Sequence, residues 1–239
     1  MLTTLLFDLD GTLLPFELDS FMRGYFERLV PHLRDHVHPH EVAPWILGAM
    51  RRVVENEVVH LTNLDKFRRA LFDNESEKEA QIWPIFEAFY ASSFQELQDL
   101  TSPTNIAREI CRTAYDKGYQ LVLATNPIFP EVATQSRMRW AGLDESWFRL
   151  VTTMENSHFC KPNPKYFLEI LDALDLAPNE CMMIGNDVQE DGAAGHVGIR
   201  TYLVTDNLID RELGTFHFEH QGTLEEVLRF VKGLPPVRS

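Results

Sequence analysis

Short apolar strands that alternate with helical patterns from about residue 105 onward constrain the fold of this chain more than any other feature. Segments typical of buried strands lie at 119–125, 149–153, 180–185 and 200–205. Apolar residues recur at helical spacing in the segments 106–114, 130–141, 164–175, 188–197 and 223–232. Because buried strands that alternate with helices need cover on both faces, the pattern predicts a parallel sheet between two layers of helices.

The first predicted strand, residues 2–7, is separated from this alternation by a long helical block. Residues 16–100 contain helical patterns and no convincing strand, and the last of these patterns begins at Pro84, which a first helical turn tolerates. The simplest architecture is an α/β fold with a Rossmann-like parallel-sheet core, formed by residues 1–15 and 101–239. An all-helical cap subdomain, residues 16–100, is inserted into it.

The charge balance limits the partners of the chain. It has 36 acidic and 22 basic residues, a formal net charge of −14 and no basic patch, so we expect neither nucleic acid nor an anionic membrane as a partner. Three cysteines without a CxxC pair argue against a disulfide framework or a structural zinc site. No apolar run approaches the roughly 20 residues that cross a bilayer, and the N-terminus lacks the basic region of a signal peptide. We therefore expect a cytoplasmic protein.

Carboxylates dominate the positions at which the predicted strands end. In open parallel sheets, ligands gather at the carboxyl ends of the strands, so side chains that follow different strands meet in one crevice. The polar and turn residues at or after these strand ends are Asp8, Asp10, Gly11, Thr12, Thr125, Asn126, Lys161, Gly185, Asn186, Asp187 and Asp191.

Carboxylates packed this closely need a cation, because otherwise some of them must take up a proton. Oxygen ligands with room for water suit Mg²⁺, which commonly joins a few carboxylates to a substrate phosphate. Lys161 and the hydroxyl of Thr125 suit the remaining phosphate oxygens, and the backbone N–H groups around Gly11 and Thr12 suit an anion. This set predicts phosphoryl transfer on a small phosphorylated metabolite, with Mg²⁺ as cofactor.

Four segments in this order resemble the motifs of the haloacid dehalogenase superfamily. They are DLDGT at 8–12, the strand that ends in Thr125, KPNPKYF at 161–167 and GNDVQED at 185–191. The helical block stands where that family carries the helical cap inserted after its first motif. One departure is Asn186, because many members read Gly-Asp where this chain reads Gly-Asn-Asp.

The resemblance implies a two-step reaction. Asp8 would be the nucleophile that forms an aspartyl-phosphate. Asp10 would protonate the leaving oxygen and then activate water for hydrolysis of the intermediate. The metal-free dehalogenases of the family lack an aspartate at the place of Asp10, because halide departure needs no proton, so the resemblance favours phosphatase activity.

The resemblance also implies binding roles. Asp8, the backbone carbonyl of Asp10 and the side chain of Asp187 would bind Mg²⁺, with Asp191 nearby or linked through water. The residues that would bind the transferring phosphoryl group are Thr125, Asn126 and Lys161.

Other functions remain open at this stage. A phosphomutase is one alternative, and a phosphonate-cleaving relative, which would use a cap lysine such as Lys66 or Lys78, is another. A non-catalytic accessory protein on the same fold is a third, although such a protein would be expected to lose Asp8 or Asp10.

Each motif also has an ordinary structural interpretation. Asp-Gly pairs are common turn formers, so Asp8 and Asp10 alone could mark a turn after an edge strand. The histidine-rich segment 36–40 is expected to be a solvated loop of the cap, and the aromatic stripe at 86–94 to be cap core. Cys160 is not expected to be a nucleophile, because no base can be identified beside it.

Overall fold

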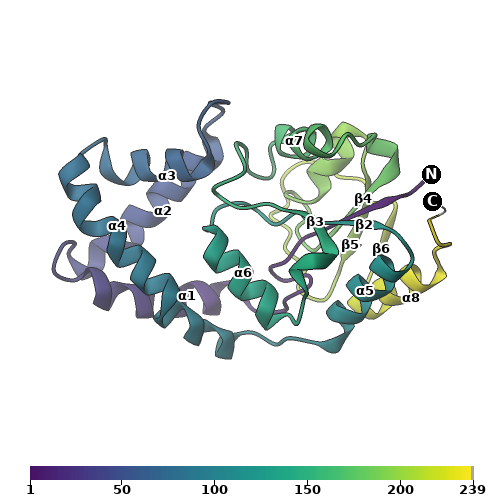
Figure 1. The fold of residues 1–239 in the computed structure, drawn as a ribbon, viewed down its shortest axis with the longest axis horizontal. Coiled ribbons are helices and arrows are strands. Elements are labelled where there is room, and N and C mark those ends of the chain that lie inside the picture. The colour runs from purple at the N-terminus through teal and green to yellow at the C-terminus, as the bar shows by residue number, and fades with distance from the viewer. Residues whose placement is uncertain (238–239) are drawn as a thin grey trace.

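The computed structural model describes residues 1–237 and contains a six-stranded sheet in which every strand pair is parallel (Figure 1). The strands are β1 (Thr4–Phe7), β2 (Gln120–Leu123), β3 (Phe148–Val151), β4 (Cys181–Gly185), β5 (Arg200–Val204) and β6 (His220–Gly222). The predicted parallel-sheet core is confirmed, and five of the strands coincide with predicted ones. The sixth, β6, was not predicted, because three residues at the edge of a sheet carry no apolar pattern.

The strand order places the predicted crevice at the centre of the sheet. The order is β3-β2-β1-β4-β5-β6, so the chain proceeds outward from β1 to β3 and then restarts at β4 on the other side of β1. A reversal of this kind opens a crevice at the carboxyl ends of the two central strands, β1 and β4.

Alternate side chains of the strands pack on opposite faces of the sheet. Leu5 and Phe7 of β1 belong to the larger hydrophobic cluster, which includes α5 (Asn105–Asp116) and α8 (Leu224–Gly233). Leu6 belongs to a second cluster with α7 (Pro164–Leu174). Both faces of β1 are therefore buried, which explains why its sequence is a continuous apolar run.

Between β1 and α5 the described chain contains helices and no strand. These helices are α1 (Leu18–Leu33), α2 (Pro39–Glu55), α3 (Asn63–Phe72), α4 (Ser76–Ala91) and the 3₁₀-helix η1 (Ser93–Leu100), and they lie to one side of the sheet (Figure 1). The expectation for Pro84 was wrong, because α4 begins eight residues earlier and Pro84 lies inside it. The aromatic stripe of α4 and η1 is buried, as expected for cap core.

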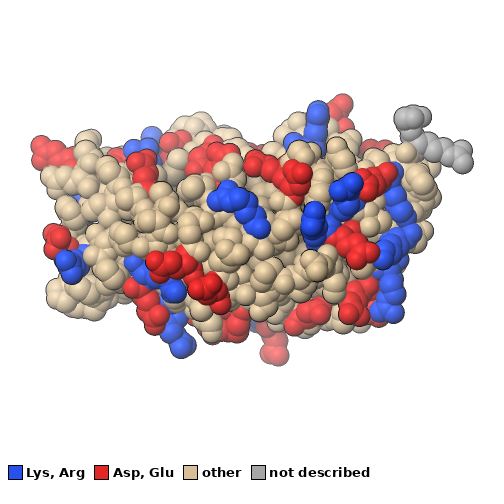
Figure 2. Space-filling model, turned by 60° about the horizontal axis from the view of Figure 1, so that its bottom comes forward, with Lys and Arg blue, Asp and Glu red and all other residues tan. Residues whose placement is uncertain are grey.

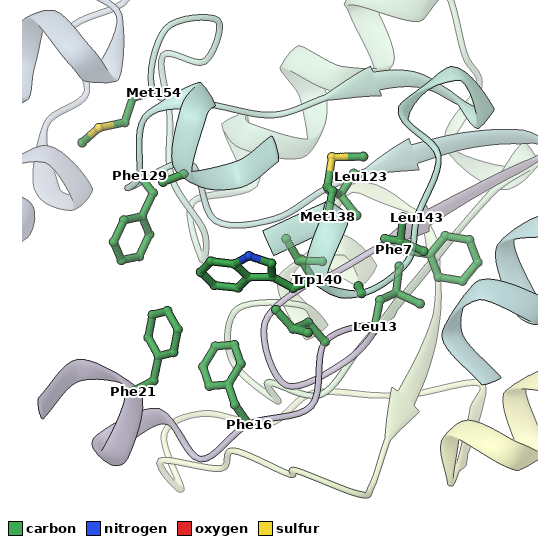
Figure 3. Close-up of a cluster of buried hydrophobic side chains, with 14 of the residues drawn as sticks. Phe7, Leu13, Phe16, Phe21, Leu123, Phe129, Met138, Trp140, Leu143 and Met154 are labelled. Carbon is green, nitrogen blue, oxygen red and sulfur yellow. The ribbon is translucent and has the colours of Figure 1, made fainter. Parts of the chain in front are cut away.

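Aromatic side chains join the helical segment to the core. Phe16 stacks on Phe21 of α1 with ring centroids 4.5 Å apart, and Figure 3 shows both turned toward Phe129 and Trp140 of the core. Trp140, the last residue of α6 (Glu131–Trp140), stacks on Phe94 of η1 at 5.4 Å. Such pairs contribute beyond their buried area and fix the geometry of the contact.

The helix predicted at 188–197 is replaced by turns and a short 3₁₀-helix, η4 (Gly192–Val197). The side chain of Asp187 accepts hydrogen bonds from the backbone N–H groups of Gln189 and Glu190, at 3.0 and 2.9 Å. Side-chain bonds of this kind compete with helical backbone bonds, and two glycines in η4 weaken the helix further.

The described residues also bear on the expectations for the cysteines, the histidine-rich segment and membrane-spanning helices. All three cysteines are buried and free of disulfides. The histidines at 36, 38 and 40 are exposed in and beside the turn between α1 and α2. Within residues 1–237, no helix is long and apolar enough to cross a membrane.

Candidate active site

Asp8 and Asp10 lie where β1 ends in a tight turn. The turn is held by hydrogen bonds from the Gly11 N–H to the Leu14 carbonyl, at 2.9 Å, and from the Leu14 N–H to the Leu9 carbonyl, at 2.8 Å. Gly11 has a φ of +82°, and a Cβ at this position would lie 2.4 Å from Nδ2 of Asn186. The position therefore requires glycine both for its backbone conformation and for the close approach of the loop after β4.

Lys161 bridges two carboxylates that follow different strands. Its side chain is fully buried, and its Nζ donates to Oδ1 of Asp8 at 2.9 Å and to Oδ1 of Asp191 at 2.6 Å. Asp191 also accepts from the backbone N–H of Asp187 at 3.0 Å. A Cβ at Gly185 would lie 2.0 Å from Oδ2 of Asp191, so glycine at the end of β4 leaves the space that this carboxylate fills.

Burial and charge act in opposite directions on these three groups. Burial raises the pKa of Asp8 well above its usual range, while the ammonium group of Lys161 opposes that rise. The pKa of Asp191 is raised by burial as well, again against the effect of Lys161. Burial alone would lower the pKa of Lys161, but Asp191 and Asp8 raise it well above its ordinary value. The two crowded carboxylates thus favour the charged form of the lysine that they share.

Arg211 neutralises Asp187, the third predicted metal ligand. Its Nη1 donates to both carboxylate oxygens of Asp187, at 2.8 and 2.7 Å, and its Nη2 lies 3.6 Å from Glu190. Burial is the main cause that raises the pKa of Glu190 to about 7, followed by the charge of Asp187. Asp187 thus lies beside Asp191 at the edge of the site, but its oxygens face an arginine.

Arg137 of α6 contacts the second carboxylate of the first motif. Its Nη1 donates to Oδ2 of Asp10. The other oxygen, Oδ1, is buried and has no hydrogen-bond partner among residues 1–237. Asp10 therefore has one oxygen bonded to an arginine and one buried oxygen without a hydrogen-bond partner among the described residues.

Thr125 and Asn126 reach the site at the end of β2. The Thr125 carbonyl accepts hydrogen bonds from the hydroxyls of Thr152 and Tyr166, at 2.7 and 3.0 Å. The amide of Asn126 brackets the backbone of Lys161, accepting from its N–H at 3.2 Å and donating to its carbonyl at 3.4 Å, and also donates to Glu190 at 3.0 Å. Asn126 thus holds the lysine loop in place.

Asn186 fastens the first motif to the loop after β5. Its Oδ1 accepts from the hydroxyl of Thr12 at 2.9 Å, and its Nδ2 donates to the carbonyl of Asn207 at 2.5 Å. Nδ2 of Asn207 donates in turn to the carbonyl of Gly11 at 3.1 Å. An amide is suited to this place because it both accepts and donates, which gives a physical reason for Asn186 in this motif.

A cavity of about 340 Å³ lies beside Asp10. It is lined by Gly11, by the start of α1 with Glu17 and Asp19, and by the loop 207–209. The cavity lies between the helical segment and the loops that follow the central strands β1 and β4.

The chemistry of the donor set fits a divalent cation. Five acidic side chains share three basic ones here, which leaves a formal excess of two negative charges, and all the acidic donors are oxygens, as Mg²⁺ prefers. The acidic residues are Asp8, Asp10, Asp187, Glu190 and Asp191, and the basic residues are Arg137, Lys161 and Arg211. In the described part of the chain, three or more acidic, histidine or cysteine side chains do not converge on one point. Arg211 therefore competes with a cation for the oxygens of Asp187.

Two of the basic residues were not found from the sequence. Arg137 shares a helical face with the buried residues Ala133 and Trp140, so a charged residue on the apolar side of a helix was a usable signal. Arg211 lies in an irregular loop whose sequence carries no comparable pattern.

The sequence model of haloacid dehalogenase-like hydrolases matches residues 2–198. A curated relative, pyrophosphatase PpaX of Anoxybacillus flavithermus, is 24% identical over 211 residues, which cover 88% of this chain and 87% of the relative.

Solved structures show the same fold. The phosphatase of this superfamily from Thermococcus onnurineus aligns with a TM-score of 0.62 and 22% identity, covering 99% of this chain and 100% of that one. The L-2-haloacid dehalogenase from Xanthobacter autotrophicus aligns with a TM-score of 0.57 and 15% identity, covering 98% and 100%.

Proposed function

The chain belongs to the haloacid dehalogenase-like hydrolases, and from the geometry of its site we propose that it is a magnesium-dependent phosphoric monoester hydrolase that forms a phosphorylated Asp8. Its substrate is a small phosphorylated metabolite. The observation that carries the proposal is the position of Asp8 and Asp10 at one strand end, with the buried Lys161 donating to Asp8 at 2.9 Å. A carboxylate nucleophile, a second carboxylate for proton transfer and a fixed cation are what phosphoryl transfer to an aspartate requires.

In the first step, an oxygen of Asp8 attacks phosphorus and the bond from phosphorus to the leaving oxygen breaks. Asp10 donates its proton to that leaving oxygen, so the product departs as an alcohol. The ammonium group of Lys161 reduces the repulsion between the Asp8 carboxylate and the anionic phosphoryl group.

In the second step, water attacks the phosphorus of the aspartyl-phosphate. The Asp10 carboxylate takes up the proton that water loses, and the bond from phosphorus to the Asp8 oxygen breaks. Inorganic phosphate leaves, and both carboxylates return to their starting states. Thr125, Asn126 and Lys161 orient the phosphoryl group in both steps.

We assign Mg²⁺ to Asp8, the backbone carbonyl of Asp10 and Asp187, with Asp191 in support. When bound, the ion supplies positive charge that stabilises the transferring phosphoryl group. Arg211 competes with the ion for Asp187 in this assignment, because it donates to both oxygens of that carboxylate.

We also propose that residues 16–100 act as a cap over a core made of residues 1–15 and 101–239. The cavity beside Asp10 is lined from both sides, by the start of α1 and by core loops. Exclusion of bulk water at this junction would protect the aspartyl-phosphate until the hydrolytic step.

The phosphonate-cleaving alternative needs a cap lysine with a free amine. Lys66 is 3% exposed, and its Nζ donates to the carbonyls of Asn56 and His158. Lys78 lies over the ring of Trp45, with its Nζ 5.8 Å from the centroid, on the exposed side of the helical segment. Neither amine is placed beside Asp8, and this favours the phosphatase.

The first test is hydrolysis of a panel of phosphorylated sugars, nucleotides, cofactor precursors and pyrophosphate, with and without Mg²⁺. Pyrophosphate is included because a relative is named a pyrophosphatase. Asp8→Asn should lower turnover by about 10³ or more, since it removes the nucleophile. Removal of Mg²⁺ with a chelator should lower it as well.

The matched control is Asp116→Asn, an exposed aspartate whose only ion-pair partner among the described residues is Arg112. This variant should retain wild-type turnover. If the wild type shows no turnover above Asp8→Asn for any substrate, the proposed function is wrong.

A further inference from the structure

Arg137 is a buried arginine, and a charged group in such a place is unusual. Its side chain is 1% exposed, although it belongs to one of the residue types that folded proteins bury least often. A buried guanidinium group is costly unless an anion and hydrogen-bond acceptors surround it. Among residues 1–237, the ion-pair partner of Arg137 is Asp10.

The structure fixes the guanidinium from the sides that do not face Asp10. Nε donates to the carbonyl of Ala133 at 3.3 Å, and Nη2 donates to the hydroxyl of Thr134 at 3.2 Å. The group also lies over the ring of Phe129, 4.6 Å from its centroid. The arginine is therefore anchored by α6 and by the loop after β2, independently of Asp10.

Asp10 is the more weakly fixed partner of this pair. Its side chain is 26% exposed, and Oδ1 makes no hydrogen bond to any residue that the structure describes. An aspartate side chain can rotate about χ1 and χ2, and an anchored donor on one oxygen restricts both rotations. The contact thus holds Oδ2 and, through it, restricts the orientation of the whole carboxylate of a residue that lines the cavity.

We propose that Arg137 is a positioning residue for Asp10, whose carboxylate transfers the protons of the reaction. The inference rests on the proposed function, because it assigns a role in the same two steps. Arg137 does not touch the substrate. It holds the carboxylate that must reach the leaving oxygen first and the attacking water afterwards, and misplacement of such a group by about 1 Å can cost about a hundredfold in rate.

The test compares Arg137→Lys and Arg137→Met with the wild type on a substrate that shows Asp8-dependent turnover. Lysine keeps the charge but loses the planar fork, and methionine loses both. We expect kcat to fall about 10- to 100-fold in Arg137→Lys and further in Arg137→Met, with KM changed less than about threefold. The matched control is Arg139→Met, an exposed arginine of the same helix that donates to Ser136 at 2.8 Å, and it should retain wild-type kcat.

Two further readouts separate positioning from a structural role. If Arg137 acts through Asp10, Arg137→Lys should lower kcat less than about threefold in an Asp10→Asn background, because the effects of groups that act as a unit do not multiply. Acid quenching should also trap more phosphorylated enzyme in Arg137→Lys than in the wild type, since the hydrolytic step needs Asp10 as base. Thermal unfolding of each variant verifies that it is folded, and Arg137→Lys decides the matter if Arg137→Met does not fold.

Three results would overturn the inference. One is an unchanged kcat in folded Arg137→Lys. A second is that Arg137→Lys lowers kcat by the same factor in the Asp10→Asn background as in the wild type. A third is a rise of KM with kcat preserved, which would assign Arg137 to substrate binding. In all three the wild type still shows Asp8-dependent turnover, so the proposed function stands. Absence of that turnover overturns both.

Discussion

At the scale of single residues, the site depends on one cation between two buried carboxylates. Lys161 is fully buried and donates to Asp8 and Asp191. Lys161→Met should lower the free energy of unfolding by about 3–5 kcal/mol at pH 7, because it leaves two buried carboxylates without their counter-ion. Urea unfolding followed by circular dichroism measures this change.

The difference in the free energy of unfolding between Lys161→Met and the wild type should become smaller as the pH falls toward 4. Burial raises the pKa of Asp8 and of Asp191, so without the lysine these groups take up protons in the folded state and the repulsion disappears. Lys165→Met is the control, since Lys165 is exposed and pairs with Glu57 at the surface. A loss of less than about 1 kcal/mol in Lys161→Met would contradict this account of the site.

The sequence predicted some contacts of the site and not others, for a physical reason. Asp8, Lys161 and Asp191 meet because each follows a strand or loop whose place in a parallel sheet can be inferred from pattern. The partners of Asp10 and Asp187 are arginines, one from a helix interior and one from an irregular loop. No local pattern specifies which long side chain reaches across a crevice, so these two contacts required the structure.

At the scale of elements, the strands and most helices followed from apolar periodicity. The exceptions share a cause, because in each of them tertiary contacts or side-chain bonds outweighed the local pattern. Pro84 lies inside α4 although its sequence favours a helix start, and the Asp187 turn displaced the helix predicted at 188–197. The short edge strand β6 is formed by pairing with β5 and has no apolar pattern of its own.

A buried pair of tyrosines in the helical segment makes the free energy of unfolding of the protein depend on pH in the alkaline range. The hydroxyls of Tyr25 and Tyr90 lie 2.9 Å apart, and the ring of Tyr25 packs against Phe129 of the core at 5.8 Å. Burial is the main cause that raises the pKa of Tyr90 to about 12. The folded state therefore keeps a proton that the unfolded state releases above about pH 10.

It follows that the free energy of unfolding falls as the pH rises from about 10 to 12, because the unfolded state binds fewer protons there. Tyr90→Phe removes this contribution, so between pH 9 and 11 the variant should lose about 1 kcal/mol less stability than the wild type. Urea unfolding at each pH measures the difference. Replacement of the exposed Tyr115 by phenylalanine should leave the pH dependence unchanged, and an unchanged dependence in Tyr90→Phe would contradict the burial argument.

At the scale of the whole molecule, the net charge of −14 opposes the approach of an anionic substrate. Figure 2 shows acidic side chains along the length of one face, interspersed with basic ones that gather most at the end that carries α5 and α8. Two exposed acidic residues, Glu17 and Asp19, also line the cavity beside Asp10. Under the proposed function, attraction of a phosphate therefore depends on the cations of the site, Lys161 and the proposed Mg²⁺ among them, and not on the surface.

Added salt should consequently speed the association of an anionic substrate with the protein. We expect kcat/KM for a dianionic phosphate ester to rise about two- to threefold between 0.02 and 0.15 M salt at constant Mg²⁺, since screening weakens the repulsion. The control is kcat itself, which should not change, because it measures steps after the substrate has bound. A steep fall of kcat/KM with salt would mean that a positive surface guides the substrate, contrary to this account.

The central claim is that Asp8 becomes phosphorylated and Asp10 promotes removal of the phosphoryl group. The most direct measurement is acid quenching of Asp10→Asn during turnover of a substrate labelled in its phosphate, followed by mass analysis of the peptide that contains residue 8. The account predicts that the label accumulates on Asp8 toward one phosphoryl group per chain, and that Asp8→Asn carries none. Turnover in the wild type without any label on Asp8, or with the label on another residue, would contradict it.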